Sequence, residues 1–287
     1  MGRDTVKGKE NAARAVFFLS AGVSVLAVLV ICIFLFANGI PAMLKIGVLN
    51  FLGGTHWKPM LDIFGILPMI TGSLCVTLGA LIIGVPAGVL TAVFLVYFCP
   101  KKIYKFAKPA IDLLAGIPSV VYGFFGLMVI VPAIREISGN SGTSMLAASV
   151  VLGIMILPTI IGLSEASIRA VNAACYEGSL ALGASHERSV FYAVLPAARS
   201  GINASIILGV GRAVGETMAV IMVAGNQALL PRGIFKGIRT LTANIALEMG
   251  YAADLHRDAL IATAVTLFVI ILLVNFLFSF FKRKQEQ

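Results

Sequence analysis

The sequence predicts an all-α integral membrane protein with six transmembrane helices. Of its 287 residues 59% are apolar and only 12% are charged, whereas a soluble domain averages about 45–50% and about 25%. The mean hydropathy is +0.99. The apolar runs reach the roughly 20 residues that a spanning helix needs, and they do not alternate as barrel strands do. This composition argues against a soluble enzyme, a nucleic-acid-binding domain and a disordered regulator.

The first span is predicted at residues 15–37, which carry no charge. A basic leader, residues 1–14, precedes it, so a signal peptide is the alternative. The apolar run exceeds the 7–15 residues of a signal sequence, and no small-residue cleavage site follows, so we expect a retained helix. Residues 38–71 then form an extracytoplasmic loop, which Trp57 and its apolar neighbours could place along the membrane interface.

Five further spans make up a transmembrane core at residues 72–281. We expect the core helices at residues 72–97, 113–134, 137–164, 201–231 and 259–281. A long cytoplasmic loop covers residues 165–200, a short amphipathic helix covers residues 240–251, and residues 282–287 form a cytoplasmic tail.

The basic residues set the orientation of these spans. With both termini inside, the inner segments hold 14 of the 22 Lys and Arg residues, the outer loops hold seven, and Arg212 lies within a span. Cytoplasmic loops carry the excess of Lys and Arg, so both termini are expected in the cytoplasm. The cysteines show no paired spacing and are expected to be free and buried; they are Cys32, Cys75, Cys99 and Cys175.

Two charges interrupt the span at residues 201–231. A lone charge at the centre of a bilayer costs at least about 2.5–3.5 kcal/mol on insertion scales. If the span is one helix, the i, i+4 spacing of Arg212 and Glu216 places them on one face, where they can neutralise each other. They are either a packing pair or a polar element of a translocation path. We group them with the neighbouring Thr217 as candidate pathway residues. The planar guanidinium of an arginine presents several N–H donors together, which suits the oxygens of a tetrahedral oxyanion.

A helix–turn–helix is expected in the cytoplasmic loop. Glu177 begins a helical run with Gly178 and Ser179, Gly183 permits a tight turn, and a second short helix starts near His186. Leu195 and Pro196 then lead toward the next span. Such an element offers a protruding contact to a soluble partner; an ordinary amphipathic loop is the alternative.

These residues resemble a cytoplasmic pattern of the permeases of binding-protein-dependent ABC importers. In that pattern Glu-Ala-Ala is followed by Gly three residues on, and by an aliphatic-x-Leu-Pro block nine residues later. Glu177, Gly183, Leu195 and Pro196 match, Gly178 and Ser179 replace the alanines, and Ala193 replaces the larger aliphatic residue. The resemblance implies that this loop docks on a separate ATP-hydrolysing subunit. No phosphate loop of the form G-x-x-x-x-G-K-[ST] occurs in this chain, which agrees with a separate ATPase.

Longer blocks resemble the phosphate-specific permeases, and the PstC type more than the PstA type. They are residues 64–72, 108–125, 211–219 and 240–250, with residues 53–57 favouring the PstC type. The resemblance implies a subunit of an ATP-driven phosphate importer in a bacterial inner membrane, without a cofactor of its own. The implied partners are a PstA-like permease, a PstB-like ATPase dimer, a PstS-like extracytoplasmic phosphate-binding protein and membrane lipid, but no nucleic acid.

Three alternatives remain open. The chain could be an ABC permease for molybdate or sulfate, or a secondary transporter in which Arg212 and Glu216 relay protons. An intramembrane enzyme is disfavoured, because the sequence offers no paired aspartates and no Ser-His dyad at span depth. A metal site is not expected: His56, His186 and His256 are scattered, and His186-Glu187 lacks the second histidine of a zinc-protease motif.

Overall fold

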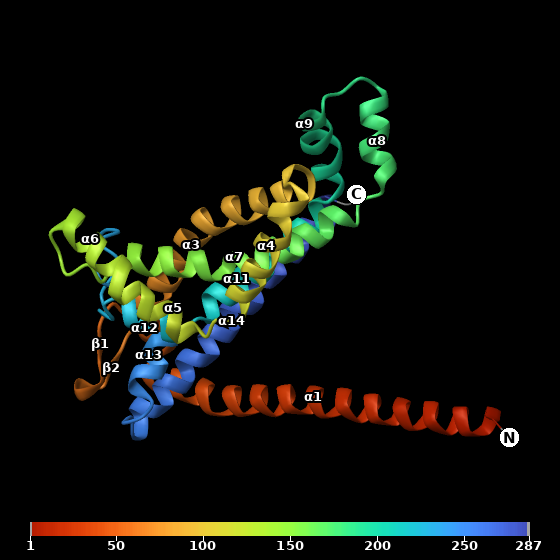
Figure 1. Ribbon diagram of the computed structural model, residues 1–287. Coiled ribbons are helices and arrows are strands. Elements are labelled where there is room, and N and C mark those ends of the chain that lie inside the picture. The colour runs from red at the N-terminus through yellow and green to blue at the C-terminus, as the bar shows by residue number, and fades with distance from the viewer. Residues whose placement is uncertain (1, 286–287) are drawn as a thin grey trace.

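The computed structural model describes the backbone of residues 2–285 and the side chains of residues 13–277. The helices form an elongated bundle (Figure 1). Both chain ends lie at the same end of the bundle as the hairpin of α8 and α9, whereas β1, β2, α6 and α13 lie at the opposite end, here named the distal end. The side chains of the leader up to residue 12 and of the tail at residues 282–287 lie outside the described part.

Five helical stretches are long and apolar enough to cross a membrane: Ala13–Ile46, Leu67–Phe98, Ser119–Ser138, Met145–Arg169 and Asp254–Leu277. A sixth is counted if His186–Ala197 and Arg199–Gly215, which meet at a bend of 70°, form one span. The all-α, multi-pass prediction is confirmed, with a two-stranded sheet as a minor addition.

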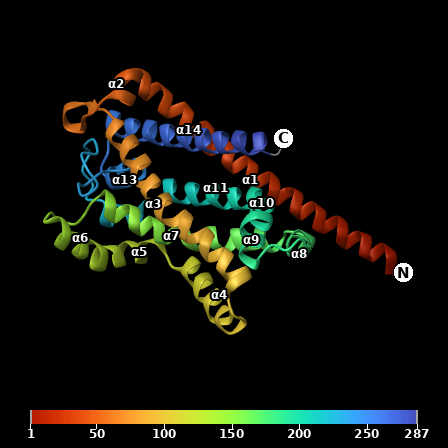
Figure 2. The ribbon, with the colours of Figure 1, turned by 90° about the horizontal axis from the view of Figure 1, so that it is seen from above.

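The first helix is longer than the expected span. Helix α1 covers Gly2–Ile46 and continues through Pro41, and α2 covers Val48–Gly53. Residues 38–46 are therefore helical rather than part of a loop. Helix α1 packs on α14, Asp254–Gln285, near the distal end, and its first half runs away from the bundle in both views (Figures 1 and 2). The described side chains at residues 13–31 of this helix are exposed, as expected of a helix that lipid or another subunit covers.

A short hairpin follows at the distal end. Strands β1, Trp57–Lys58, and β2, Ile63–Phe64, pair antiparallel around the 3-10 turn η1, Pro59–Leu61. The position of residues 38–71 along the membrane interface stays a prediction, but the side chain of Trp57 does not face outward. Its side chain is only 8% exposed and packs edge-on against Phe64, with 5.4 Å between ring centroids.

The centre of the bundle is the pair of α3, Leu67–Val93, and α7, Met145–Arg169. Glycines allow their close approach: a Cβ on Gly84 or Gly88 would press on the side chains of Ile156 and Ile160. Small residues at helix contacts serve this purpose in membrane proteins, where packing replaces the hydrophobic driving force. The five-residue π-helix η2, Phe94–Phe98, extends α3.

The third predicted span is broken at its start. Helix α4, Lys101–Gly116, ends where residue 117 precedes Pro118, because a residue before proline is pushed out of the helical region. The span proper then runs through α5, Ser119–Phe125, the π-helix η3, Gly126–Ile130, and α6, Val131–Ser138. The Tyr122 hydroxyl donates to the Leu114 carbonyl over 2.7 Å and satisfies one acceptor that the break frees.

The remaining expectations differ in their boundaries. Helix α7 begins at Met145 rather than residue 137, since α6 and a glycine turn occupy the residues before it; α7 ends at Arg169, so Glu165 is helical rather than part of the loop. The four cysteines are free as expected, but none is buried: Cys175 is exposed, and Cys32, Cys75 and Cys99 are partly exposed. The other elements are α8 (Ala173–Ala181), α9 (His186–Ser189), η4 (π-helix Val190–Val194), α10 (Leu195–Ala197), α11 (Arg199–Gly215), α12 (Met218–Val223) and α13 (Leu241–Glu248).

Candidate functional site

The fifth predicted span is broken at Glu216. Helix α11 ends at Gly215, Glu216 has extended backbone angles of φ −71° and ψ 133°, and α12 begins at Met218. The Glu216 carboxylate turns forward and accepts the Ala219 N–H over 3.1 Å, which caps one of the free donors of α12. The expectation of one continuous helix with both charges on one face is therefore wrong.

Arg212 lies four residues before the break, on the last turn of α11. Its guanidinium is half-buried and donates from Nη1 to the Thr159 hydroxyl of α7 over 3.1 Å. Among the side chains that the structure describes, Arg212 and Glu216 form no ion pair. A guanidinium has five N–H donors, so most of those on Arg212 remain available. Thr217 is also half-buried, and its hydroxyl donates to the Gly215 carbonyl over 3.3 Å.

The loop after α7 has the expected helix–turn–helix. The Asn172 side chain caps α8 by accepting the Ala174 N–H, and the Ser185 hydroxyl caps α9 by accepting the Arg188 N–H. Gly183 lies between them with φ +86°, a region that L side chains rarely adopt. Figure 1 shows α8 and α9 as a hairpin at the end of the bundle. We name residues 173–197 the coupling hairpin.

The predicted docking residues lie on or beside this hairpin. Exposed positions are Glu177, Gly178, Gly183 and Pro196, whereas Ser179 and Leu195 are half-buried. Large apolar side chains are also exposed here, with Leu182 at 91% and Tyr192 at 79% of their full area. Solvent-exposed apolar groups on a protruding element are typical of a contact surface.

An aromatic cluster joins the coupling hairpin to the end of α3. A hydrogen bond of 2.6 Å links the Tyr176 hydroxyl to His186 Nδ1. The His186 ring also packs against Phe98, with centroids 4.8 Å apart, and Tyr176 packs against Tyr97 at 5.2 Å. A displacement of the hairpin must therefore move α3, or break these contacts.

A buried carboxylate on α7 was not identified from the sequence. Glu165 is 3% exposed and accepts from the Tyr104 hydroxyl over 2.8 Å and from Arg169 Nε over 3.1 Å. Lys108 Nζ lies 3.2 Å from its other oxygen, so the cluster ties α4 to α7. The hydrogen bond to Glu165 raises the pKa of Tyr104. The i, i+4 spacing of Glu165 and Arg169 was a usable signal, but the assignment of both residues to a loop concealed it.

A second network at the distal end was also missed. The Glu248 carboxylate, 6% exposed, takes three donors, from Trp57 Nε1, His256 Nε2 and Arg239 Nη1. Trp57 lies 191 residues from Glu248 in the chain, so no sequence spacing marks this contact. We name Trp57, Arg239, Glu248 and His256 the distal cluster.

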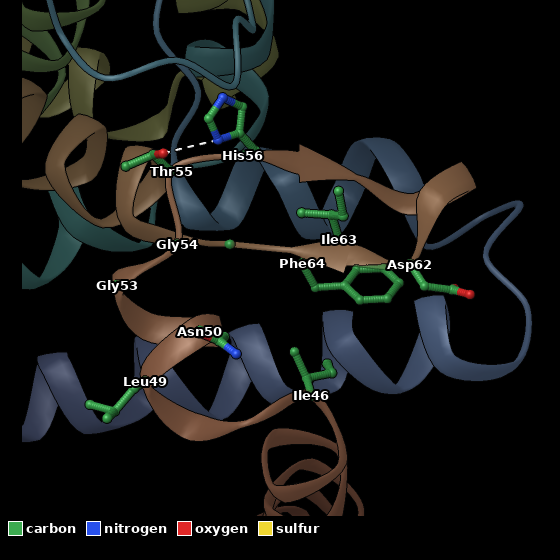
Figure 3. A pocket seen from close by; sticks show the side chains of 11 residues that line it. Ile46, Leu49, Asn50, Gly53, Gly54, Thr55, His56, Asp62, Ile63 and Phe64 are labelled. Carbon is green, nitrogen blue, oxygen red and sulfur yellow. Dashed lines mark hydrogen bonds between the residues drawn. The ribbon is translucent and has the colours of Figure 1, made fainter.

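A distal pocket of about 500 Å³ lies between α2 and the hairpin of β1 and β2. Figure 3 shows Asn50 and Ile46 on its α2 side and the His56 ring hydrogen-bonded to Thr55 on the other. None of the predicted site residues lines it.

The chain matches known proteins over most of its length. Residues 84–287 match the family described as "Binding-protein-dependent transport system inner membrane component". A relative from Bacillus subtilis, "Probable ABC transporter permease protein YqgH", is 37% identical over 96% of this chain and 91% of its own. The "Phosphate transport system permease protein PstC" of Mesorhizobium japonicum is 32% identical over 95% of this chain and 90% of its own.

Solved structures with a similar fold are also transporters. The permease of the MetNI methionine ABC transporter, in an inward-facing conformation, aligns over 80% of this chain and 99% of its own, with a TM-score of 0.58 and 21% identity. A chain of a bacterial alginate ABC transporter, in complex with its periplasmic protein, aligns over 93% and 94%, with a TM-score of 0.63 and 16% identity. These likenesses support the fold.

Proposed function

Because the chain belongs to the family of binding-protein-dependent transport system inner membrane components, we propose that it is a permease subunit of an ATP-driven inorganic phosphate importer. It forms half of the pore and does no covalent chemistry. The PstC relatives, at about a third identity over most of the chain, support phosphate as the substrate. The partners are a PstA-like permease, a PstB-like ATPase dimer and a PstS-like binding protein.

The observation that carries this proposal is the state of Arg212. Its guanidinium is half-buried on a candidate spanning helix, and among the described side chains its hydrogen-bond partner is a neutral hydroxyl, not a carboxylate. A cation in apolar surroundings without a counter-ion is costly, and such groups mark substrate paths. A planar fork of N–H donors also matches the oxygens of a phosphate. Glu216 and Thr217 line the break beside it, where their backbone is free of the helix.

The geometry offers a route from the ATPase to this residue. The coupling hairpin ends with α10, and after a bend of 70° the chain continues as α11 toward Arg212. In the proposed mechanism the ATPase presses on α8 and the turn at Gly183. The motion passes to α11 directly and to α3 through Tyr97, Tyr176 and His186, so the two helices shift and the path opens alternately to each side.

In the proposed orientation the coupling hairpin lies in the cytoplasm. Both chain ends lie at the same end of the bundle as the hairpin, which agrees with the excess of Lys and Arg in those segments. The distal end then faces the outside. A cysteine at position 286 resists impermeant thiol reagents in intact cells if this orientation holds, and labelling there contradicts it.

The test is phosphate uptake per unit of inserted protein in the complete importer. Arg212→Leu lowers uptake about tenfold or more, because a hydrogen bond to a charged group is worth about 1.5–3 kcal/mol and 1.4 kcal/mol is a factor of ten. Arg212→Lys lowers it less, since an ammonium lacks the fork. Arg232→Leu, at an exposed distal position, is the matched control and leaves uptake unchanged.

The double variant separates the pathway role from a packing role. Because Arg212 and Glu216 are not paired, Arg212→Leu with Glu216→Leu does not restore uptake. Restoration by the double variant would refute the pathway role. Two further measurements separate this proposal from its alternatives. Uptake that needs the ATPase chain and survives a protonophore excludes a secondary transporter. Uptake that excess sulfate and molybdate do not inhibit excludes a permease for those oxyanions.

A further inference from the structure

The distal cluster is a buried ionic network that the transport proposal does not use. Glu248 on α13 lies 2.6 Å from Arg239 Nη1, 2.8 Å from His256 Nε2 on α14 and 2.8 Å from Trp57 Nε1 on β1. The side chains of Arg239, Glu248 and His256 are 18%, 8% and 14% exposed. A buried carboxylate needs this many donors to remain charged, and removing one partner strands the others.

The cluster joins four segments, of which the hairpin of β1 and β2 is remote in sequence from the other three. Arg239 also donates from Nε to the Asn226 carbonyl over 2.9 Å and from Nη1 to the Asn244 side chain over 3.0 Å. One carboxylate, that of Glu248, thus fixes the loop after α12, the helix α13, the hairpin of β1 and β2, and α14. The His256 ring stacks on Phe64 and meets Trp57 edge-on, with centroids 6.1 Å apart in each case.

Helix α13 carries this restraint to the break at Glu216. The Thr242 hydroxyl donates to the Glu216 carbonyl over 2.9 Å, and the Leu241 N–H donates to the Ser73 hydroxyl of α3 over 2.9 Å. Leu241 and Ala243 are fully buried. The first turn of α13 therefore lies against the extended backbone of Glu216, and its last residue, Glu248, lies in the distal cluster.

We propose that Glu248 is a positioning residue that, through the distal cluster, keeps α13 seated over the break at Glu216 and Thr217. Its release lets α13 lift and opens the break to the distal side. This inference rests on the proposed function at one point only, which is that the break belongs to the substrate path. Glu248 does not touch the substrate.

The test measures access to Thr217 in the complete importer in intact cells, without added phosphate. The four native cysteines are replaced by alanine, Thr217→Cys is the reporter, and an impermeant maleimide is added outside. Glu248→Gln destabilises the seated position of α13 by about 1.4 kcal/mol, which raises the population of the unseated state about tenfold. The labelling rate of Thr217→Cys therefore rises about tenfold. Glu136→Gln, at an exposed carboxylate on α6, is the matched control and leaves the rate unchanged.

Two further variants keep the test decisive. Trp57→Phe preserves the ring but removes one hydrogen bond to Glu248, so it raises labelling by a smaller factor even if Glu248→Gln does not insert. Ser205→Cys, at a fully buried position on α11, stays unlabelled in the Glu248→Gln background unless the whole bundle loosens. Labelling of Thr217→Cys at the parent rate in these variants, or equal gains at both reporters, overturns the inference. Because the measurement uses no phosphate, it is independent of which substrate the importer carries.

Discussion

The turn at Gly183 gives the sharpest test of the coupling hairpin. Gly183 has φ +86°, and a Cβ built there meets nothing within 4 Å. Gly183→Ala therefore adds no clash, and its cost is the left-handed backbone alone, about 1–2 kcal/mol for an L residue. Since 1.4 kcal/mol is a factor of ten, the population of the observed turn falls about tenfold. If the ATPase binds this geometry, its apparent affinity for the permease falls by the same factor.

Two matched variants isolate the backbone term. Gly178→Ala lies inside α8, where a Cβ also meets nothing and alanine favours the helix by about 0.5–1 kcal/mol. It keeps full affinity. Gly183→Asn also keeps most of the affinity, because asparagine tolerates the left-handed region better than alanine does.

Two measurements are made. The affinity comes from titrating the purified ATPase onto the permease pair in detergent. The coupling comes from the ATP hydrolysis that loaded binding protein stimulates in the reconstituted importer. The expected order of affinity is wild type and Gly178→Ala, then Gly183→Asn, then Gly183→Ala. Equal losses for the alanine and asparagine variants at residue 183 would mean that side-chain bulk, not backbone conformation, decides docking. Wild-type affinity for both would remove the turn from the interface.

Two stability predictions follow from the packing. Glu165→Gln removes the charge that Tyr104, Lys108 and Arg169 share, whereas Tyr104→Phe removes one hydrogen bond to that charge and costs about 1.5–3 kcal/mol. Lys108 keeps Asp112 at 3.0 Å and Arg169 is 47% exposed, so Glu165→Gln costs more than Tyr104→Phe only by these solvent-screened ion pairs. Thermal unfolding in detergent ranks the two variants, and an inverted order contradicts the cluster. Gly54→Ala lowers the unfolding temperature because its Cβ would meet the Asn50 carbonyl and the Gly65 backbone, while Gly53→Ala, with nothing within 4 Å, does not; equal effects would refute the close approach.

The long helices and the coupling hairpin could be predicted from sequence because each depends on local signals. Uncharged runs of about 20 residues have few alternatives in a bilayer, and only helices and closed barrels satisfy their backbone there. Gly183 and the capping residues Asn172 and Ser185 determine the hairpin within a few residues of themselves. The predicted boundaries are wrong where one residue interrupts an apolar run. The run at residues 113–134 suggests one helix, but Pro118 ends α4 at Gly116 and the span proper starts at Ser119.

The contact of Trp57 with Glu248 could not be predicted, because the two residues lie 191 positions apart in the chain. Trp57 reads as an interfacial anchor when its neighbours alone are considered, and Glu248 as a polar position on an amphipathic helix. Their contact depends on the packing of β1 against α13 and α14, which no periodicity encodes. The cost of leaving either partner unsatisfied in the interior explains why they meet.

The pair of Arg212 and Glu216 shows what a spacing rule assumes. An i, i+4 pair lies on one face only while the helix continues, and here the backbone leaves the helix at Glu216. The carboxylate is then needed by α12, whose free N–H it accepts at Ala219, and its own carbonyl is held by Thr242. Arg212, left with the Thr159 hydroxyl, keeps donors for an anion. The break thus separates two charges that a continuous helix would neutralise, and this separation makes a substrate role for Arg212 physically reasonable.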